Sequence, residues 1–229
     1  MPITRRLRLA AVVLAVLGLA ALIGWQFLVH WHPSMSDYRF QGVSVSQAQG
    51  PIDWEQVHES GADFAYVRAT NGTLGRDIMF DDNWRAAFEA GLKRGAYLDY
   101  SLCGLAADQA NLFNTVVPQT QDQLPPAIFI DFTDDCPARP ERQVVVGEIA
   151  RAMAVIENHL GRPAILQVSP AVEARYQLAS AIPRPLWETG TFFPPDYAGR
   201  PWRLWQANAR RRVPGIQTSV EWSVVANGR

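Results

Sequence analysis

An apolar segment near the N-terminus restricts the fold of this chain more than any other feature. Residues 9–29 carry no formal charge and are mostly Ala, Leu, Val and Ile. A helix of that length spans about 30 Å, the thickness of the hydrocarbon core of a bilayer. Because a bilayer offers no hydrogen-bond partners to an exposed backbone, the segment is predicted to form one transmembrane helix.

The charges around this segment predict its orientation. Arg5, Arg6 and Arg8 precede it, whereas every acidic residue lies beyond Ser36. Basic residues beside a membrane span stay on the cytoplasmic side, so the bulk of the chain is expected to be exported. The sequence thus predicts a single-pass protein of the inner (cytoplasmic) membrane, with its C-terminal domain periplasmic or otherwise extracytoplasmic.

A cleaved signal peptide is the alternative interpretation, since Ala20 and Ala21 supply the small residues of a cleavage site. The apolar run is longer than the usual core of about 7–15 residues and continues past these alanines, which favours an uncleaved signal anchor. The chain is then divided into a cytoplasmic N-terminus (1–8), a transmembrane anchor (9–29), a linker (30–38) and an exported domain (39–229).

The composition and length of the exported part indicate one weakly acidic globular domain. Three of the 21 Lys and Arg residues precede residue 9, which leaves 18 basic against 22 acidic residues, a net charge of −4. Residues 39–229 are enough for one domain with a substantial core. The acidity gives no reason to expect nucleic acid as a partner, and the basic residues at 210–212 are interpreted as a solvated turn.

The two cysteines agree with export. Cys103 and Cys136 both fall in loop-like segments, and in an oxidising compartment such a pair is expected to form a disulfide. The chain-entropy estimate for closing that loop is about 3–4 kcal/mol. Because no CxxC or HxxxH spacing occurs, no metal site and no cofactor are expected.

Strand-like and helix-like segments alternate through most of the exported domain. Short runs rich in apolar and β-branched residues are predicted as strands at 40–46, 64–69, 96–100, 127–130 and 163–168. Helical spacing of apolar residues separates them at 51–58, 80–92, 105–116 and 145–160. Segments 186–187, 202–206 and 220–226 then look like strands joined with little helix. About eight strands with right-handed crossovers predict an α/β fold closed into a trimmed TIM-like barrel.

Reactive groups in such barrels lie at the ends of strands, which selects the candidate site. The polar candidates there are carboxylates, amides and a hydroxyl: Asp99, Asp131, Glu221, Asn71, Gln167, Gln206 and Ser44. Aromatic residues accompany them as Tyr97, Trp187 and Trp205, although most tryptophans in a small barrel belong to the core. A groove of aromatic, amide and carboxylate groups suits a sugar, whose ring faces stack and whose hydroxyls need donors and acceptors.

Several segments, in order, resemble glycoside hydrolase family 25, whose members are lysozymes (N-acetylmuramidases). The segments are GVSVSQAQG (42–50), IDW (52–54), FAYVRATNG (64–72), GLKRGAY (91–97), 124–131, 202–206, 213–216 and 220–228. The resemblance covers about residues 40–228. It implies a barrel of five β/α units followed by three further strands, and cleavage of the muramic acid–glucosamine bond of peptidoglycan. Peptidoglycan or a related glycan is therefore the expected partner.

The chain departs from the family's pattern at several catalytic positions. Ser44 stands where the first strand normally carries an acid, Asn71 replaces the Glu that ends the second, and Leu98 replaces a His. Glu221 stands where the last strand usually carries Asp. In the fourth strand the family presents Asp-x-Glu, whose Glu is the proposed general acid, but this chain has Thr133 at that place.

The loss of this acid leaves the activity open. A threonine hydroxyl is too weak an acid to protonate a leaving group near neutral pH. Asp131, expected to be partly desolvated at the end of a buried strand, remains from the pair, with Asp99 or Glu221 as possible assistants. Asp134 and Asp135 are within reach but are interpreted as solvated loop residues.

Three hypotheses follow. The protein is an active or weakly active muramidase with a rearranged acid, a non-catalytic glycan-binding module, or an envelope scaffold that uses the barrel to dock other proteins.

Overall fold

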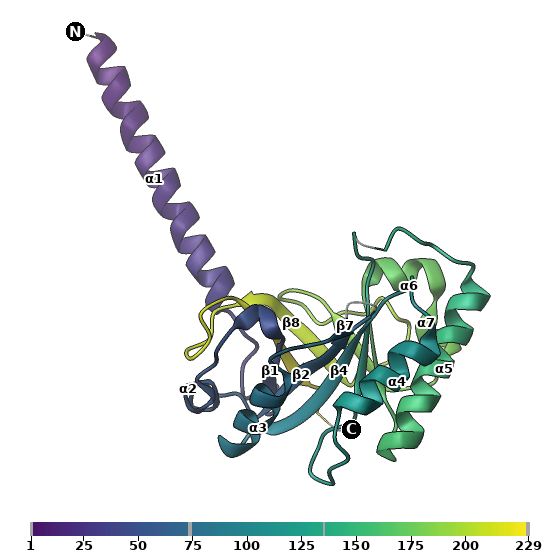
Figure 1. The fold of residues 1–229 in the computed structure, drawn as a ribbon. Helices are drawn as coiled ribbons and strands as arrows, with labels where there is room; N and C mark the ends of the chain where they lie inside the picture. The colour runs from purple at the N-terminus through teal and green to yellow at the C-terminus, as the bar shows by residue number, and fades with distance from the viewer. Residues whose placement is uncertain (1, 73–74, 135, 228–229) are drawn as a thin grey trace.

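The computed structural model describes residues 2–72, 75–134 and 136–227. Helix α1 (Pro2–His30) projects from a barrel that contains the rest of the chain (Figure 1). Its stretch Arg8–His30 is long and apolar enough to cross a membrane, by length and composition. The barrel confirms the predicted α/β class.

In the described part of the chain, eight strands close the barrel in the order β1-β9-β8-β7-β6-β5-β4-β2, with β2 returning to β1. Their bounds are β1 Gln41–Val45, β2 Phe64–Asn71, β4 Lys93–Tyr100, β5 Ala127–Ile130, β6 Ile165–Val168, β7 Leu186–Thr189, β8 Leu204–Arg211 and β9 Val220–Val225. Neighbouring strands are parallel except that β9 is antiparallel to both β8 and β1. The two-residue strand β3 (Gly75–Arg76) pairs only with the end of β2.

Helices follow the first five barrel strands, and the last three strands lack them, as expected. The helices are α2 Trp54–Glu59, α3 Phe80–Glu89, α4 Ala106–Val116, α5 Arg142–Leu160, α6 Pro170–Tyr176 and α7 Leu178–Ala181, with a short 3-10 turn η1 at Gln47–Gln49. The fifth unit has its helical part at residues 170–181, a segment for which the spacing of apolar residues predicts no helix bounds. There, Ser169 caps α6 by accepting a hydrogen bond from the Val172 amide at 3.3 Å, and Pro170 starts the first turn.

Two apolar layers hold the domain together. One lies between the helices and the outer face of the barrel, and it includes the predicted α5 stripe of Val145, Ile149, Met153, Ile156 and Leu160. The other fills the barrel, where the Tyr97 ring stacks on Phe129 with centroids 4.2 Å apart. Because the interior is packed with aromatic rings, a ligand has access only to the ends of the barrel.

Candidate active site

One pocket of about 350 Å³ opens at the end of the barrel where the parallel strands terminate. Six of the predicted site residues line it, from six different strands or strand ends: Asn71, Asp99, Asp131, Gln167, Gln206 and Glu221. Thr133 lines it as well. Because the strands meet at this rim of the barrel, it brings together residues that lie as far apart in sequence as Asn71 and Glu221.

Asp99 is tied to a chain of charges at the side of the pocket. Arg68 donates from Nη1 to Asp99 Oδ2 at 3.1 Å and from Nε to Asp77 Oδ2 at 2.9 Å. The Asp77 side chain is only 1 % exposed, whereas that of Asp99 is 36 % exposed. Burial raises the pKa of Asp99 and the Asp77 carboxylate adds to this, while Arg68 opposes the shift. Arg68 thus fixes Asp99 in place.

Glu221 reaches the same pocket because β9 runs antiparallel, so the start of β9 lies where the other strands end. Burial raises the pKa of Glu221 to about 7, and the charges of Asp99 and Asp131 contribute. A carboxyl with that pKa is about half protonated at neutral pH and can both donate and accept a proton. Among the pocket carboxylates, Glu221 has the properties of a general acid.

Asp131 lies at the pocket entrance, and its environment differs from the expectation. Its side chain is exposed, not partly desolvated, because β5 ends one residue earlier and the following loop leaves the barrel. Its Oδ1 accepts a hydrogen bond from the Phe132 amide at 2.8 Å. Asp134 is exposed on the same loop, as expected, and Asp135 lies outside the described residues.

Two buried side-chain amides also line the pocket. Gln167 on β6 donates from Nε2 to Gln206 Oε1 on β8 at 3.4 Å. Asn71 ends β2, and the Gly72 amide that follows it donates to the Asp99 carbonyl at 2.7 Å. These groups give the pocket both donors and acceptors, which sugar hydroxyls require.

The other four predicted site residues do not contribute to the pocket lining. Tyr97 and Trp187 point into the barrel but lie in the aromatic layer beneath the pocket. Trp205 is on the outer face of β8, because side chains alternate along a strand and Gln206 takes the inward position. Ser44 is buried at the pocket end, directly opposite Glu221 in the pairing of β1 and β9.

Further pocket residues were not among the predicted ones. Ser169 and Thr189 line the pocket at the ends of β6 and β7, and the same strand-end principle could have selected them. The link from Arg68 to Asp77 has no signal in the sequence, since it depends on the side chains meeting in space. Among the residues that the structure describes, no three His, Cys, Asp or Glu side chains are arranged to hold a metal ion.

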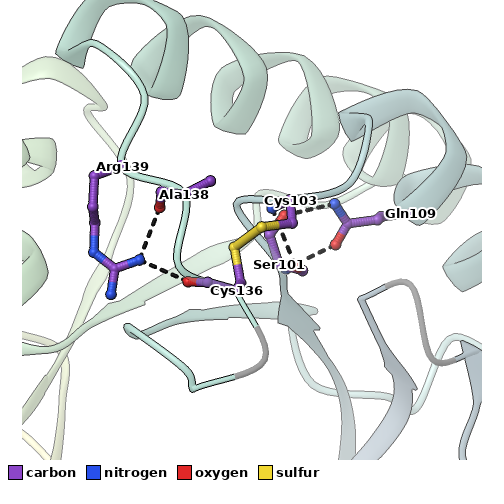
Figure 2. Close-up of a disulfide and its surroundings, with 6 residues drawn as sticks. All are labelled: Ser101, Cys103, Gln109, Cys136, Ala138 and Arg139. Atoms are coloured by element: carbon purple, nitrogen blue, oxygen red, sulfur yellow. Dashed lines mark hydrogen bonds between the residues drawn. A yellow bond between two sulfur atoms is a disulfide. The ribbon is translucent and has the colours of Figure 1, made fainter.

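The predicted disulfide is confirmed and lies at the rim of this end of the barrel. Figure 2 shows Cys103, in the loop after β4, bonded to Cys136, in the loop after β5, with Cα atoms 5.7 Å apart. Gln109 holds the first loop by accepting from the Ser101 amide and donating to the Ser101 carbonyl, both at 2.9 Å. Arg139 donates to the Cys136 carbonyl at 2.7 Å. The loops that carry the pocket entrance are thereby joined.

Comparison with known proteins agrees with this geometry. A sequence model of "Glycosyl hydrolases family 25" matches residues 43–216. The uncharacterized protein YegX of Escherichia coli K12 is 30% identical over 196 residues, covering 82% of this chain and 70% of YegX. A family 25 glycosyl hydrolase from Bacillus anthracis superimposes with a TM-score of 0.79 at 28% identity, covering 87% of this chain and 94% of that one. A bacterial lysozyme from Streptomyces coelicolor gives a TM-score of 0.75 at 25% identity, with 82% and 92% covered.

Proposed function

Because the chain belongs to glycosyl hydrolase family 25, we propose that its pocket binds peptidoglycan or a related amino-sugar glycan and hydrolyses the muramic acid–glucosamine bond. The observation that carries this proposal is the meeting of Asp99, Asp131 and Glu221 with Gln167 and Gln206 in one open pocket. Carboxylates supply the chemistry of glycoside hydrolysis, and amides bind sugar hydroxyls.

Glu221 takes the role of the missing acid in this proposal. Its protonated carboxyl donates a proton to the glycosidic oxygen as the bond from C1 to that oxygen breaks, and the bonding electron pair leaves with the oxygen. The positive charge that develops at C1 is stabilised by the Asp131 carboxylate. A water molecule then adds to C1 and returns a proton to Glu221. Asp99, held by Arg68, orients the sugar.

A non-catalytic glycan-binding module is the second candidate. The observation that favours it is Thr133, which lines the pocket where the family resemblance places the general acid. A protein with the groove but without a working acid would bind the glycan and leave its bonds intact.

The N-terminal helix supports a membrane-attached site of action. In this proposal residues 9–29 anchor the chain in the cytoplasmic membrane, residues 1–8 stay in the cytoplasm, and the domain 39–229 lies outside. A reporter that is active only in the cytoplasm, fused after Arg229, is then expected to be silent. An active reporter would refute this topology.

Full-length protein in mild detergent, incubated with insoluble peptidoglycan, tests the function. Two quantities are measured together: the protein that sediments with the glycan and the reducing ends that are released. Binding with release supports the muramidase, and binding alone supports the binding module. Neither binding nor release would contradict both and leave a scaffold for other proteins as the remaining hypothesis.

A further inference from the structure

The C-terminal end of α1 is fixed to the barrel and not joined to it by a loose tether. The buried side chain of Asn208, on β8, donates from Nδ2 to the carbonyls of Leu28 and Trp31 at 2.8 and 2.9 Å. The Arg212 amide donates to the Val29 carbonyl at 2.6 Å. These bonds satisfy carbonyls that the end of a helix otherwise leaves unpaired, so they hold the helix at a defined place.

Aromatic packing joins the same parts. The Trp31 ring lies against Phe192, with centroids 4.8 Å apart, and near Trp205, at 6.4 Å. Phe27, inside the apolar stretch of α1, stacks on Phe192 at 6.3 Å. Since Phe27 belongs to the segment that would lie in the bilayer, its contact with the barrel leaves no room for a spacer between the barrel and the membrane surface.

The pocket is close to this junction. Gln206 lines the pocket, and Asn208, which holds α1, follows it by two residues on β8. Thr189 lines the pocket, and Phe192, which contacts α1, follows it by three residues. With about 3.8 Å between successive Cα atoms, the pocket wall lies within roughly 8–11 Å of the residues that fix the helix.

The helix and the pocket mouth are also at the same end of the barrel. Asn208 and Arg212 lie towards the end of β8 and just beyond it, and the pocket is formed by the ends of the strands parallel to β8. Figure 1 shows α1 leaving on the side of the long loop between β5 and α5, whereas the loop that precedes β5 lies on the opposite side. The pocket therefore opens towards the side from which the helix projects.

The surface beside the helix suits a bilayer interface. Phe193, next to Phe192, is 79% exposed, and Arg210 and Arg212, close in sequence to the Asn208 contact with α1, are exposed as well. An aromatic ring is stable at the headgroup level, and arginine binds phosphate groups. Because α1 projects from this part of the barrel, these residues would lie at the headgroup level of the bilayer that α1 spans.

From this arrangement we propose that the substrate is an amino-sugar glycan that is itself attached to the membrane, such as a chain linked to a polyprenyl diphosphate. The inference rests on the proposed function of the pocket and on α1 spanning the membrane. A pocket fixed at the bilayer surface meets lipid-linked glycan at high local concentration and does not reach wall polymer at a distance.

The first measurement concerns orientation and needs no activity. Full-length protein in vesicles carries a fluorophore on a bioorthogonal residue at position 133, at the pocket rim, or at position 121, in the loop before β5. Quenching by headgroup-labelled lipid is expected to be strong at 133 and weak at 121. Equal quenching, or stronger quenching at 121, would overturn the inference whether or not the protein hydrolyses a glycan.

The second measurement compares substrates. An oligomer of alternating N-acetylglucosamine and N-acetylmuramic acid is supplied either on a polyprenyl diphosphate in the same vesicles or free in solution. The wild type is expected to bind or cleave the lipid-linked form at least about tenfold better. A helical spacer of about 20 residues inserted after His30 lifts the barrel by about 30 Å and should abolish the preference without lowering use of the free form.

The same spacer inserted before Arg5 is the matched control, because it adds the same mass without moving the barrel, and it should keep the preference. Equal use of both forms by the wild type would overturn the inference. If neither form is bound or cleaved although position 133 is quenched, the orientation stands, and the proposed function of the pocket is what fails.

Discussion

Glu221 lies directly opposite Ser44 in the antiparallel pairing of β1 and β9. Ser44 Oγ is buried and has no hydrogen-bond partner among the residues that the structure describes. The family resemblance places an acid at this position of the first strand, so a hydroxyl here removes a negative charge beside Glu221. Burial is the main cause of the raised pKa of Glu221, and the carboxylates that add to it are those of Asp99 and Asp131.

Replacing Asp131 tests its role as the anionic group of the site. Asp131→Asn keeps the shape of the side chain but removes the charge that would stabilise the positive centre at C1. We expect release of reducing ends to fall by at least about 100-fold, with binding to peptidoglycan and the melting temperature nearly unchanged. Because Asp131 is exposed, loss of the folded state in this variant would instead make it a structural residue.

Thr133→Glu restores a carboxyl where the family presents its acid. The side chain lines the pocket, so the substitution adds a possible proton donor without disturbing the core. Turnover is expected to rise above that of the wild type, by up to about 100-fold, because general acid catalysis contributes factors of that order. Thr133→Gln, which has the same length but no acidic proton, is the control and should gain nothing. A gain with Gln would show that contact and not acidity is responsible.

Several features of this site could be predicted from the sequence and others could not. The position of reactive groups at strand ends selects Asp99 and Asp131, because polar residues at the end of apolar runs are visible in the sequence. Glu221 lies at the start of β9, and its selection is supported by the family resemblance, which places an acid in the last strand. Strand-end position also selected Trp187 and Trp205, since the sequence does not show whether a side chain points inward, or how deep in the barrel it lies.

The charge pairs show the same limit. Arg68 lies on β2, Asp77 follows β3, and Asp99 lies on β4. The three side chains meet only because the fold brings these elements together in space. The disulfide was easier to predict, since the chain contains only two cysteines and both follow neighbouring strands. The resemblance implies a helical part after the fifth strand, but the residue pattern does not locate α6 and α7, because two short helices give too few turns for a clear apolar period.

Because of Glu188, the stability of the protein is expected to fall as the pH rises towards 7. Glu188 is fully buried on β7, and in the described part of the chain neither carboxylate oxygen has a hydrogen-bond partner. Burial raises its pKa from 4.5 to about 7. A raised carboxyl pKa costs nothing below pH 4.5, becomes unfavourable as the pH rises towards 7, and has its full cost above pH 7.

Glu188→Gln should therefore stabilise the protein increasingly as the pH rises. Its effect on the free energy of unfolding should grow by about 2 kcal/mol between pH 5 and pH 8. Urea unfolding of the full-length protein in detergent measures this, with the exposed Glu59→Gln as control. A benefit that is equal at both pH values would show that Glu188 does not titrate in this range.

Removing the disulfide tests how firmly the rim is held. The double substitution Cys103→Ser and Cys136→Ser should lower the free energy of unfolding by about 3–4 kcal/mol, because the unfolded chain regains the freedom of the closed loop. The free energy of unfolding is measured for both proteins with and without reductant. Reductant should lower that of the wild type and leave that of the double variant unchanged. A wild type that is equally stable in both conditions would contradict the estimate.

Turnover in this account depends on Glu221 supplying the proton, and the pH dependence of reducing-end release tests this directly. Wild-type protein and Glu221→Gln are compared on a soluble glycan oligomer between pH 5 and pH 9, with binding measured in parallel. The wild-type rate should fall about tenfold for each pH unit above 7, and Glu221→Gln should bind normally but react at least about 100-fold more slowly. A Glu221→Gln variant as fast as the wild type, or a wild type that binds the oligomer and releases no reducing ends at any pH, would contradict the account.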